Sequence, residues 1–486
     1  MKAIDIDVAI VGGGTSGLSA AVAAAQAGAK VVVFEKSSTT GGTGNMAMGP
    51  FAVESWIQRL RKISITREEA FNIHMSFTHA RVDARLVKAF IDKSASTISW
   101  LENMGVEFSD VHAHNPGFYF TWHTVKSGAG GTGPGAAAVM LKIMAETAMD
   151  LGVKILLNTP AKSIVREHGK IAGLIAEDKS GQEIKANAKA VIVNTGGFGD
   201  NPEWIKKYTG YDWGRDLFSI RIPGLVGDGL RMAWDLGAAP TDMTIHLTSG
   251  IANIAPFYTV FFTFLQPNLM VDIRGERIIN EEFMQTTPFF GNIVTRQKNR
   301  CAFYIFDEDT KKYYQEKGLD FPPGVMAGYS IKTIDDFDSE MKQAIDQGKD
   351  VYIADSIEDI AAKFGINKPT LLQTINEYNK ACESGRDELF HKNPRFLRPI
   401  KKAKFYAARL FPDGFGTLGG IKINYKTEVL NNDLEAIPGL YAAGVDANSI
   451  NSDTYAFVLP GSTFGFAVNS GRIAGEEAAK YAAVAK

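Results

Sequence analysis

The amino-acid sequence predicts an α/β fold in which a buried parallel sheet is interrupted by an inserted α+β segment. Three observations support this prediction. Residues 7–36 read as a complete β-α-β unit. Further short apolar runs of strand length follow at 153–158 and 188–193. A chain of 486 residues is also too long for one ordinary hydrophobic core, so two domains are expected.

The β-α-β unit begins with the apolar run Val8–Val11, which is typical of a strand in a parallel sheet. A G-x-G-x-x-G pattern follows, formed by Gly12, Gly14 and Gly17. These glycines allow a tight turn, approach of the backbone to a pyrophosphate and close helix packing, respectively. The N-terminus of the expected helix Ser16–Ala27 would offer N–H groups to the phosphates. The strand Val31–Phe34 ends at Glu35, whose carboxylate would accept hydrogen bonds from ribose hydroxyls. The unit therefore predicts a Rossmann-like domain that holds a dinucleotide.

Composition narrows the class of protein. The net charge is −2, with 52 basic and 54 acidic residues, which argues against a nucleic-acid footprint. Gly or charged residues interrupt every long apolar stretch, so we expect no membrane span. The N-terminus runs straight into a core strand without a targeting pattern, which suggests a cytoplasmic protein.

Cys301 and Cys382 are the only cysteines, which excludes iron–sulfur ligation by the chain's own thiols. With no second dinucleotide motif of comparable context, electrons are expected to come from, or pass to, an external partner.

A second glycine-rich loop, residues 37–50, follows Glu35. Its pattern E-K-x4-G-G-x-x-x-x-A-x-G resembles the flavoprotein subunits of the fumarate reductase and succinate dehydrogenase family and of their relatives, the 3-ketosteroid dehydrogenases. That resemblance implies FAD, bound non-covalently in a domain of the glutathione reductase type. It also implies that this loop lines the flavin side of FAD with Gly41, Gly42, Thr43, Gly44 and Gly49.

Later motifs extend the resemblance along the chain. Thr159-Pro160-Ala161 resembles the stretch that pairs with adenine, and N-T-G-G-F at 194–198 resembles a turn beside the pyrophosphate. G-D-G at 227–229, G-L-Y-A-A-G at 439–444 and G-S-T at 461–463 resemble the remaining cofactor segments. The resemblance thus implies an FAD site made of Gly12, Gly14, Ser16, Gly17, Glu35, Lys36, Gly41, Gly42, Thr43, Gly44, Gly49, Ala161, Thr195, Gly196, Asp228, Gly444, Asp446, Gly461, Ser462 and Thr463. Among these, Asp446 is expected at the ribitol hydroxyls, and Asp228 is expected to face the flavin.

The expected domains are an FAD-binding domain of residues 1–239 and 406–486 and a capping domain of residues 240–405. The aromatic run 254–270 marks the change in composition, and it suits either a core or a substrate-lining role. Helices are expected at 308–317, 335–347, 355–364 and 368–384.

The sequence departs from true fumarate reductases where they bind and protonate a dicarboxylate. Gln285 stands where the resemblance places a catalytic arginine, and Phe415 and Gly416 replace the family's histidines. No arginine occurs between Asp446 and Arg472, where a second carboxylate clamp is expected. A desolvated dianion needs such bidentate partners. The chain therefore resembles the ketosteroid dehydrogenase branch more closely, and its Asp453-Thr454-Tyr455 resembles that branch's catalytic tyrosine segment.

The predicted function is an FAD-dependent oxidoreductase of the CH–CH class, acting on a hydrophobic enone or enoate, with 3-ketosteroids as one candidate class. Hydride passes between the flavin and the β-carbon of the activated C=C, and Tyr455 is the first candidate for proton transfer. His246 and Tyr258 are alternative catalytic residues, followed by His123 and Tyr119.

Three other hypotheses are less well supported. A fumarate reductase-like enzyme would need a displaced arginine, for which Arg274 and Arg296 are candidates. A non-catalytic flavin electron carrier would not need the capping domain. His112, His114 and His123 lie in a segment expected to be irregular, and without a nearby carboxylate or thiolate ligand they do not predict a metal site.

Overall fold

The computed structural model describes residues 2–115, 117–128, 131–219, 222–322 and 333–485. The chain divides into two compact units, and each is described by itself. The first comprises residues 1–210, 221–245 and 416–486, and the second comprises residues 211–220 and 246–415. Both contain helices and strands, which confirms the predicted α/β class.

The first unit is built on a largely parallel sheet with the strand order β15-β16-β8-β1-β2-β5. Its parallel members are β1 (Lys2–Val11), β2 (Val31–Phe34), β5 (Lys154–Leu156), β8 (Glu183–Val193) and β16 (Ala436–Ala442). Antiparallel β15 (Glu428–Leu430) lies at one edge, and the hairpin β6 (Ala161–Glu167) and β7 (Lys170–Glu177) pairs with the start of β8. The parallel strands place the loops that follow them at one edge of the sheet.

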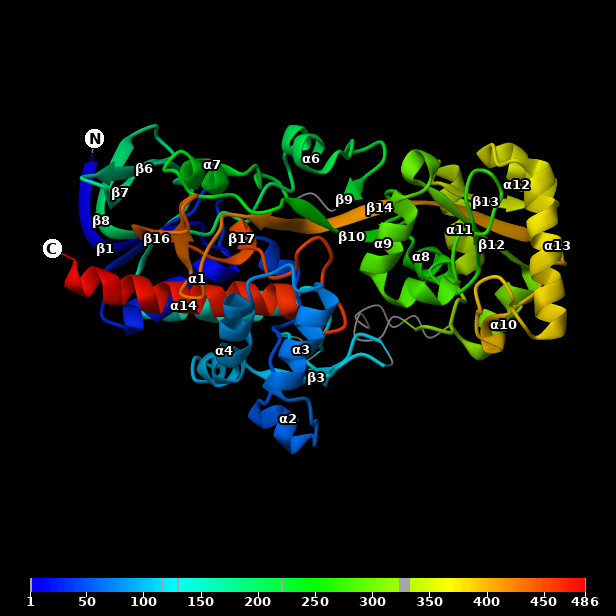
Figure 1. Ribbon diagram of the computed structural model, residues 1–486, viewed down its shortest axis with the longest axis horizontal. Coiled ribbons are helices and arrows are strands. Elements are labelled where there is room, and N and C mark those ends of the chain that lie inside the picture. Colours follow the sequence, from blue (N-terminus) through cyan, green and yellow to red (C-terminus); the bar gives the residue numbers. More distant parts are fainter. Residues whose placement is uncertain (1, 116, 129–130, 220–221, 323–332, 486) are drawn as a thin grey trace. The chain divides into compact units, whose positions relative to one another are not determined.

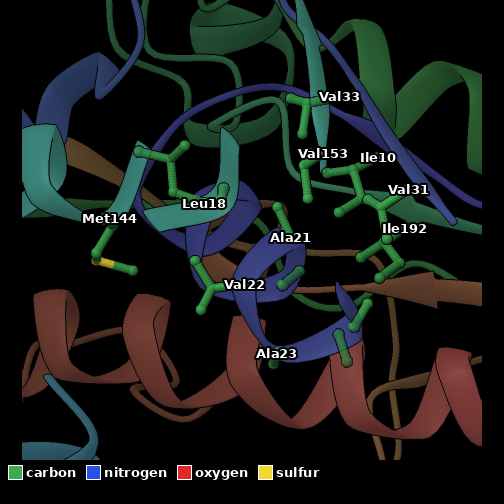
Figure 2. Close-up of a cluster of buried hydrophobic side chains, with 14 of the residues drawn as sticks. Ile10, Leu18, Ala21, Val22, Ala23, Val31, Val33, Met144, Val153 and Ile192 are labelled. Atoms are coloured by element: carbon green, nitrogen blue, oxygen red, sulfur yellow. The ribbon is translucent and has the colours of Figure 1, made fainter. Parts of the chain in front are cut away.

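Helix α1 (Thr15–Gln26) fills the space between this sheet and the C-terminal helix α14 (Ser462–Val484), seen in red in Figure 1. Figure 2 shows Leu18, Ala21 and Val22 of α1 beside Ile10, Val33 and Ile192 of the strands. The two helices approach closely because α14 carries glycine there. A Cβ atom on Gly471 would lie 2.2 Å from the Ser16 carbonyl oxygen, and one on Gly475 would lie 2.3 Å from that of Ala20. Small residues thus fix α1 against the core.

Six further α-helices lie in the described part of the first unit, and several of them begin at a side-chain cap. They are α2 (Trp56–Leu60), α3 (Arg67–Phe77), α4 (Ala84–Glu102), α5 (Ala137–Asp150), α6 (Pro202–Thr209) and α7 (Asp228–Trp234). Thr66 and Glu69 form a capping box at α3, and the Asp83 carboxylate accepts from the first N–H groups of α4.

One prediction for this unit is wrong. The histidine-bearing segment that was expected to be irregular contains the antiparallel pair β3 (Phe108–His112) and β4 (Trp122–Val125). The strands are short and polar, so their alternation gives little signal in the sequence.

The second unit has its own core around β11 (Leu269–Val271), β12 (Ala302–Asp307), β13 (Val351–Ala354) and the first part of β14 (Phe405–Gly420). Two further strands adjoin β14, namely β9 (Phe218–Ser219) and β10 (Thr244–Gly250). The later part of β14 pairs with β17 (Ala447–Asn448) in the first unit. The helices are α8 (Tyr258–Phe264), α9 (Thr287–Thr295), α10 (Glu308–Lys317), α11 (Phe337–Asp346), α12 (Ile357–Phe364) and α13 (Lys368–Ser384). The four helices predicted between residues 308 and 384 are confirmed.

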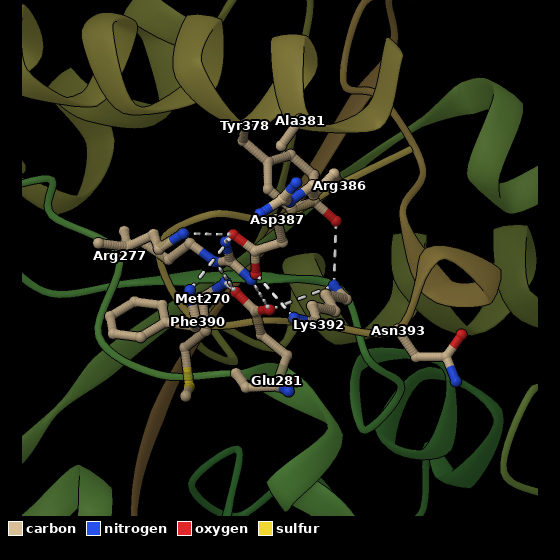
Figure 3. Close-up of polar contacts among 12 residues, drawn as sticks. Met270, Arg277, Glu281, Tyr378, Ala381, Arg386, Asp387, Phe390, Lys392 and Asn393 are labelled. Carbon is tan, nitrogen blue, oxygen red and sulfur yellow. Dashed lines mark hydrogen bonds and ion pairs between the residues drawn. The ribbon is translucent and has the colours of Figure 1, made fainter. Parts of the chain in front are cut away.

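A buried ionic network joins distant segments of the second unit (Figure 3). The Arg277 guanidinium donates to both oxygens of Glu281, each at 2.8 Å, and to Asp387 at 2.8 Å. The Lys392 ammonium lies 3.2 Å from Glu281. Burial alone would lower the pKa of Arg277, but the hydrogen bonds and charges of Glu281 and Asp387 raise it. Each charge is therefore compensated inside the unit.

Candidate active site

The glycine turn after β1 has the geometry of a phosphate-binding loop. A Cβ atom on Gly12 would lie 2.3 Å from the Asn194 carbonyl oxygen, and one on Gly17 would lie 1.9 Å from the carbonyl oxygen of Gly12 itself. A Cβ atom on Gly14, by contrast, would meet nothing within 4 Å among the described residues. No side chain of the described residues caps α1, so its first N–H groups remain available to a ligand.

Glu35 connects the two glycine-rich loops. Its carboxylate accepts from the backbone N–H groups of Gly13 and Ser37, each at 2.6 Å. The Gly41 N–H donates to the Gly13 carbonyl oxygen at 2.9 Å, and the Thr159 N–H donates to that of Glu35 at 2.8 Å. Glu35 thus holds together the two glycine-rich loops through its side chain and the Thr159 segment, which precedes Ala161 at the start of β6, through its backbone.

Lys36 and Asp228 form an ion pair with each other. The ammonium lies 2.8 Å from the Asp228 carboxylate and 3.1 Å from the Gly224 carbonyl oxygen, while Arg231 contacts the second carboxylate oxygen at 2.8 Å. The pair joins the loop after β2 to the start of α7.

Asp446 is fully buried, and its carboxylate holds the turn at 194–198. It accepts from the Thr195 N–H, from the Thr195 hydroxyl at 2.9 Å and from the Gly197 N–H at 2.7 Å. Burial raises the pKa of Asp446, whereas these donors oppose that rise. The Gly229 N–H donates to the Thr195 hydroxyl at 3.0 Å, so the same network reaches α7. This role was not visible in the sequence, because the partners lie about 250 residues apart.

The start of α14 offers polar atoms that have no partner in the described protein. Gly461 begins the helix without a side-chain cap, and the hydroxyl oxygens of Ser462 and Thr463 are buried without a hydrogen bond to any described residue. The same holds for the Thr417 hydroxyl and the Asn448 amide nitrogen. Because buried polar groups are normally hydrogen-bonded, the hydroxyls of Ser462 and Thr463 indicate a polar ligand at the helix start.

The loop predicted to line the flavin lies between the starts of two helices. A Cβ atom on Gly44 would lie 2.0 Å from the Thr15 hydroxyl at the start of α1 and 3.3 Å from the Phe464 ring in the first turn of α14. Gly444 packs against Ser16, whose hydroxyl would lie 2.4 Å from an added Cβ atom. The loop and both helix starts therefore form one cradle in the first unit. Its open approach at Gly14, free helix N-terminus and unpartnered hydroxyls fit a long phosphate-containing cofactor.

Tyr455 lies beside this cradle and is 5% exposed. The backbone N–H of Thr463 donates to its hydroxyl oxygen at 3.3 Å, so the phenol faces the start of α14. Its ring packs on Phe457 with a centroid distance of 5.7 Å, and Phe457 in turn packs on His114 and Phe118. The hydroxyl oxygen of Tyr455 thus lies at a helix N-terminus, which carries a partial positive charge.

The other candidate catalytic residues occupy different environments. His246 on β10 and Tyr258 at the start of α8 belong to the second unit, and burial lowers the pKa of His246 to about 3. His123 is fully buried, with one ring nitrogen 2.7 Å from the Ser55 hydroxyl and the other 3.1 Å from the Thr121 carbonyl oxygen. Tyr119 is 38% exposed. Both ring nitrogens of His123 thus contact other protein groups, whereas the hydroxyl of Tyr455 lies at the start of α14.

Sequence reasoning overlooked Asp413, on β14 in the second unit. Burial raises the pKa of this carboxyl to about 7. Its only signal in the sequence is that it is the one acidic residue of this strand.

The fold and this cradle define a flavin-binding oxidoreductase. Residues 7–456 match the family described as FAD binding domain, and the chain belongs to that family. The predicted FAD cofactor and the predicted oxidoreductase class are therefore confirmed. Among the described residues, no helix is long and apolar enough to cross a membrane.

Two curated relatives and one solved structure are similar to this chain. The chain is 32% identical to vinyl phenol reductase of Lactiplantibacillus plantarum, over 98% of this chain and 96% of the relative. It is 29% identical to fumarate reductase (cytochrome) of Shewanella frigidimarina, over 98% of this chain and 77% of the relative. The crystal structure of 3-ketosteroid Δ1-dehydrogenase from Sterolibacterium denitrificans shares the fold, with a TM-score of 0.78, 21% identity and coverage of 98% and 99%.

Proposed function

We propose that this protein is an FAD-dependent reductase of a hydrophobic alkene whose C=C bond is conjugated to a phenol or a carbonyl group. The observation that carries the proposal is the aromatic cluster at the start of α14, where Tyr455, Phe457 and His114 gather. The full-length similarity to a vinyl phenol reductase supports it. Reduction is the proposed direction, because both curated relatives described above are named as reductases.

The chain's own residues would hold FAD in an extended arrangement. We assign the pyrophosphate to Gly12, Gly14 and the start of α1, and the adenosine ribose to Glu35. The other assigned contacts are Ser16, Gly17, Lys36, Gly41, Gly42, Thr43, Gly44, Gly49, Ala161, Thr195, Gly196, Asp228, Gly444, Asp446, Gly461, Ser462 and Thr463. When bound, FAD supplies two-electron redox chemistry, and an external donor must supply the electrons.

Tyr455 would supply the proton that completes reduction of the alkene. The Thr463 N–H already points at its hydroxyl oxygen, so the charge that develops when the proton leaves is held by a backbone dipole. His246 and Tyr258 are the alternative donors. The aromatic side chains around Tyr455 would hold an apolar substrate and exclude water from the proton transfer.

A dicarboxylate is a poorer candidate substrate. Of the two arginines that could replace the missing catalytic arginine, Arg274 is paired with Asp272 at 2.7 Å and with Glu276 at 2.9 Å. A dianion would have to compete with both carboxylates for this guanidinium.

A panel of alkenes tests the proposal. Purified FAD-loaded protein would be mixed with reduced methyl viologen and then with 4-vinylphenol, an aryl acrylate, a 3-keto-4-ene steroid or fumarate. We expect viologen oxidation with one of the first three and little with fumarate. Fastest turnover of fumarate would overturn the substrate assignment. Reoxidation of FAD by none of the alkenes would favour the electron-carrier hypothesis.

A further inference from the structure

His114 lies between β3 and β4 in a cluster of aromatic rings. Its imidazole packs edge-on against Phe457, with centroids 4.3 Å apart and planes at 73°, and against Trp122 at 6.0 Å and 82°. Its Nδ1 atom is buried and has no hydrogen-bond partner among the described residues. Buried polar groups are normally hydrogen-bonded, so this nitrogen is a candidate to bind a polar group of a ligand.

The rings around His114 lead directly to the proposed proton donor. Phe457 contacts His114 on one side and Tyr455 on the other, with centroids 5.7 Å apart in the second pair. Trp122 lies beside the start of α14, where a Cβ atom on Gly461 would be 2.8 Å from its ring. The unpaired nitrogen and the phenol of Tyr455 therefore belong to one cluster within the first unit.

The chemistry of the cluster suits a neutral aromatic ligand. Burial lowers the pKa of His114 to about 4, so the imidazole is neutral at pH 7 and offers one N–H donor and one nitrogen acceptor. The rings that flank it favour stacking with an aromatic ligand over contact with a carboxylate. A hydroxyl on an aromatic ring can donate to the acceptor nitrogen while the ring packs against the neighbouring side chains.

We propose that His114 determines substrate specificity by hydrogen bonding, through Nδ1, to a phenolic hydroxyl conjugated to the alkene. This inference rests on the proposed function and deepens it. It assigns His114 to recognition of the substrate oxygen and leaves proton transfer to Tyr455. A substrate that lacks the hydroxyl would leave Nδ1 unpaired, so the enzyme would discriminate against it.

Matched substrates test this assignment. The kcat/KM ratio of 4-vinylphenol to 4-methylstyrene would be measured for the wild type, for His114→Phe and for His114→Asn. We expect His114→Phe, which keeps a ring but removes both nitrogens, to lower the ratio about tenfold, as loss of one hydrogen bond predicts. We expect His114→Asn to restore part of it, because its amide lies near the position of Nδ1. His168→Phe, on an exposed turn of the same unit, is the matched control and should leave the ratio unchanged.

A binding measurement provides a readout that does not depend on turnover. The saturated product 4-ethylphenol should bind His114→Phe about tenfold more weakly than the wild type by calorimetry, whereas ethylbenzene should bind both equally. Unchanged affinity together with an unchanged kcat/KM ratio would overturn the assignment of His114. Wild-type protein that reduces an aryl acrylate or a 3-keto-4-ene steroid but neither styrene would overturn the assignment of His114 and leave the proposed function standing, whereas wild-type protein that reduces none of these alkenes would reject the proposed function.

If His114→Phe does not fold, the pair His114→Asn and His114→Gln carries the test. Asn keeps a polar group near Nδ1 and should keep the preference for the phenol, whereas Gln extends the amide towards the position of Nε2 and should lose it. Equal preferences in these two variants would overturn the inference.

Discussion

The substitution Tyr455→Phe tests whether the hydroxyl of Tyr455 donates a proton in the reaction or only stabilises the fold. The change removes only the hydroxyl, whose oxygen accepts a hydrogen bond from the Thr463 N–H at 3.3 Å. Loss of one hydrogen bond of this kind lowers the free energy of unfolding by about 1 kcal/mol, and the packing of the ring on Phe457 is unaffected. The variant should therefore fold and keep its flavin.

The expected effect on the rate is much larger than the effect on stability. A general acid contributes about 10²–10⁴ in rate, which corresponds to about 2.7–5.4 kcal/mol of activation free energy. If Tyr455 donates the proton, Tyr455→Phe should slow reoxidation of the reduced flavin by the alkene by that factor. A purely structural tyrosine would change the rate only a few-fold, so the two roles predict different magnitudes.

Single-turnover stopped-flow measurements are the appropriate assay, because they isolate the chemical step from product release. Tyr441→Phe is the matched control, since Tyr441 is a buried tyrosine of the same unit whose hydroxyl donates to the Glu477 carbonyl oxygen at 3.4 Å. The control should lose similar stability without a change in rate. A rate within about threefold of wild type in Tyr455→Phe would refute the assignment and move the search for the acid to His246.

Three further predictions concern the cofactor, acid stability and the second unit. Gly14→Ala should weaken FAD binding while the FAD-free protein keeps its stability, because an added methyl meets no described atom within 4 Å. Gly17→Ala should lose both FAD binding and stability, because its methyl would lie 1.9 Å from a carbonyl oxygen. Flavin content and urea unfolding of the two variants would show the difference. Burial lowers the pKa of His123 from 6.5 to about 4, so the unfolded chain binds the proton more readily. Stability should thus fall by up to about 3 kcal/mol as the pH drops from 6.5 to 4, and His123→Gln should flatten that dependence. Arg277→Met leaves two buried carboxylates without their guanidinium and should lower the free energy of unfolding by about 3–5 kcal/mol in urea titrations, whereas a change below 1 kcal/mol would contradict the network described above.

The sequence predicted the parts of this fold whose signal is local. The strand Val31–Phe34 has the predicted bounds, and helix α1 differs from its prediction by one residue at each end, because apolar runs, glycine spacing and an alanine-rich segment all fall within 30 residues. The helices α10 and α13 also have the predicted bounds. Strong caps mark them, such as Asn367 before α13 and Gly385 after it.

The sequence did not predict hydrogen bonds between residues that lie far apart in the chain. Asp446 and Thr195 are joined over 251 residues, and Arg277 and Asp387 over 110. Neither pairing has a periodic pattern that could reveal it, since each depends on how strands and loops meet in space. The prediction of Asp446 as a cofactor ligand thus identified an important residue but not its partners within the protein.

The buried arginine of the second unit is already paired with carboxylates of that unit, which supports the proposal of an uncharged substrate. The Arg277 guanidinium donates its hydrogen bonds to Glu281 and Asp387 of the same unit. Redirecting this guanidinium to a substrate carboxylate would leave an acidic side chain buried and uncompensated, which costs several kcal/mol. A neutral phenol or carbonyl imposes no such cost, because a single hydrogen-bond donor or acceptor satisfies it. The presence of Gln285 at the position of the expected arginine and the aromatic surroundings of Tyr455 both support the proposed uncharged alkene, which needs no cation to bind it.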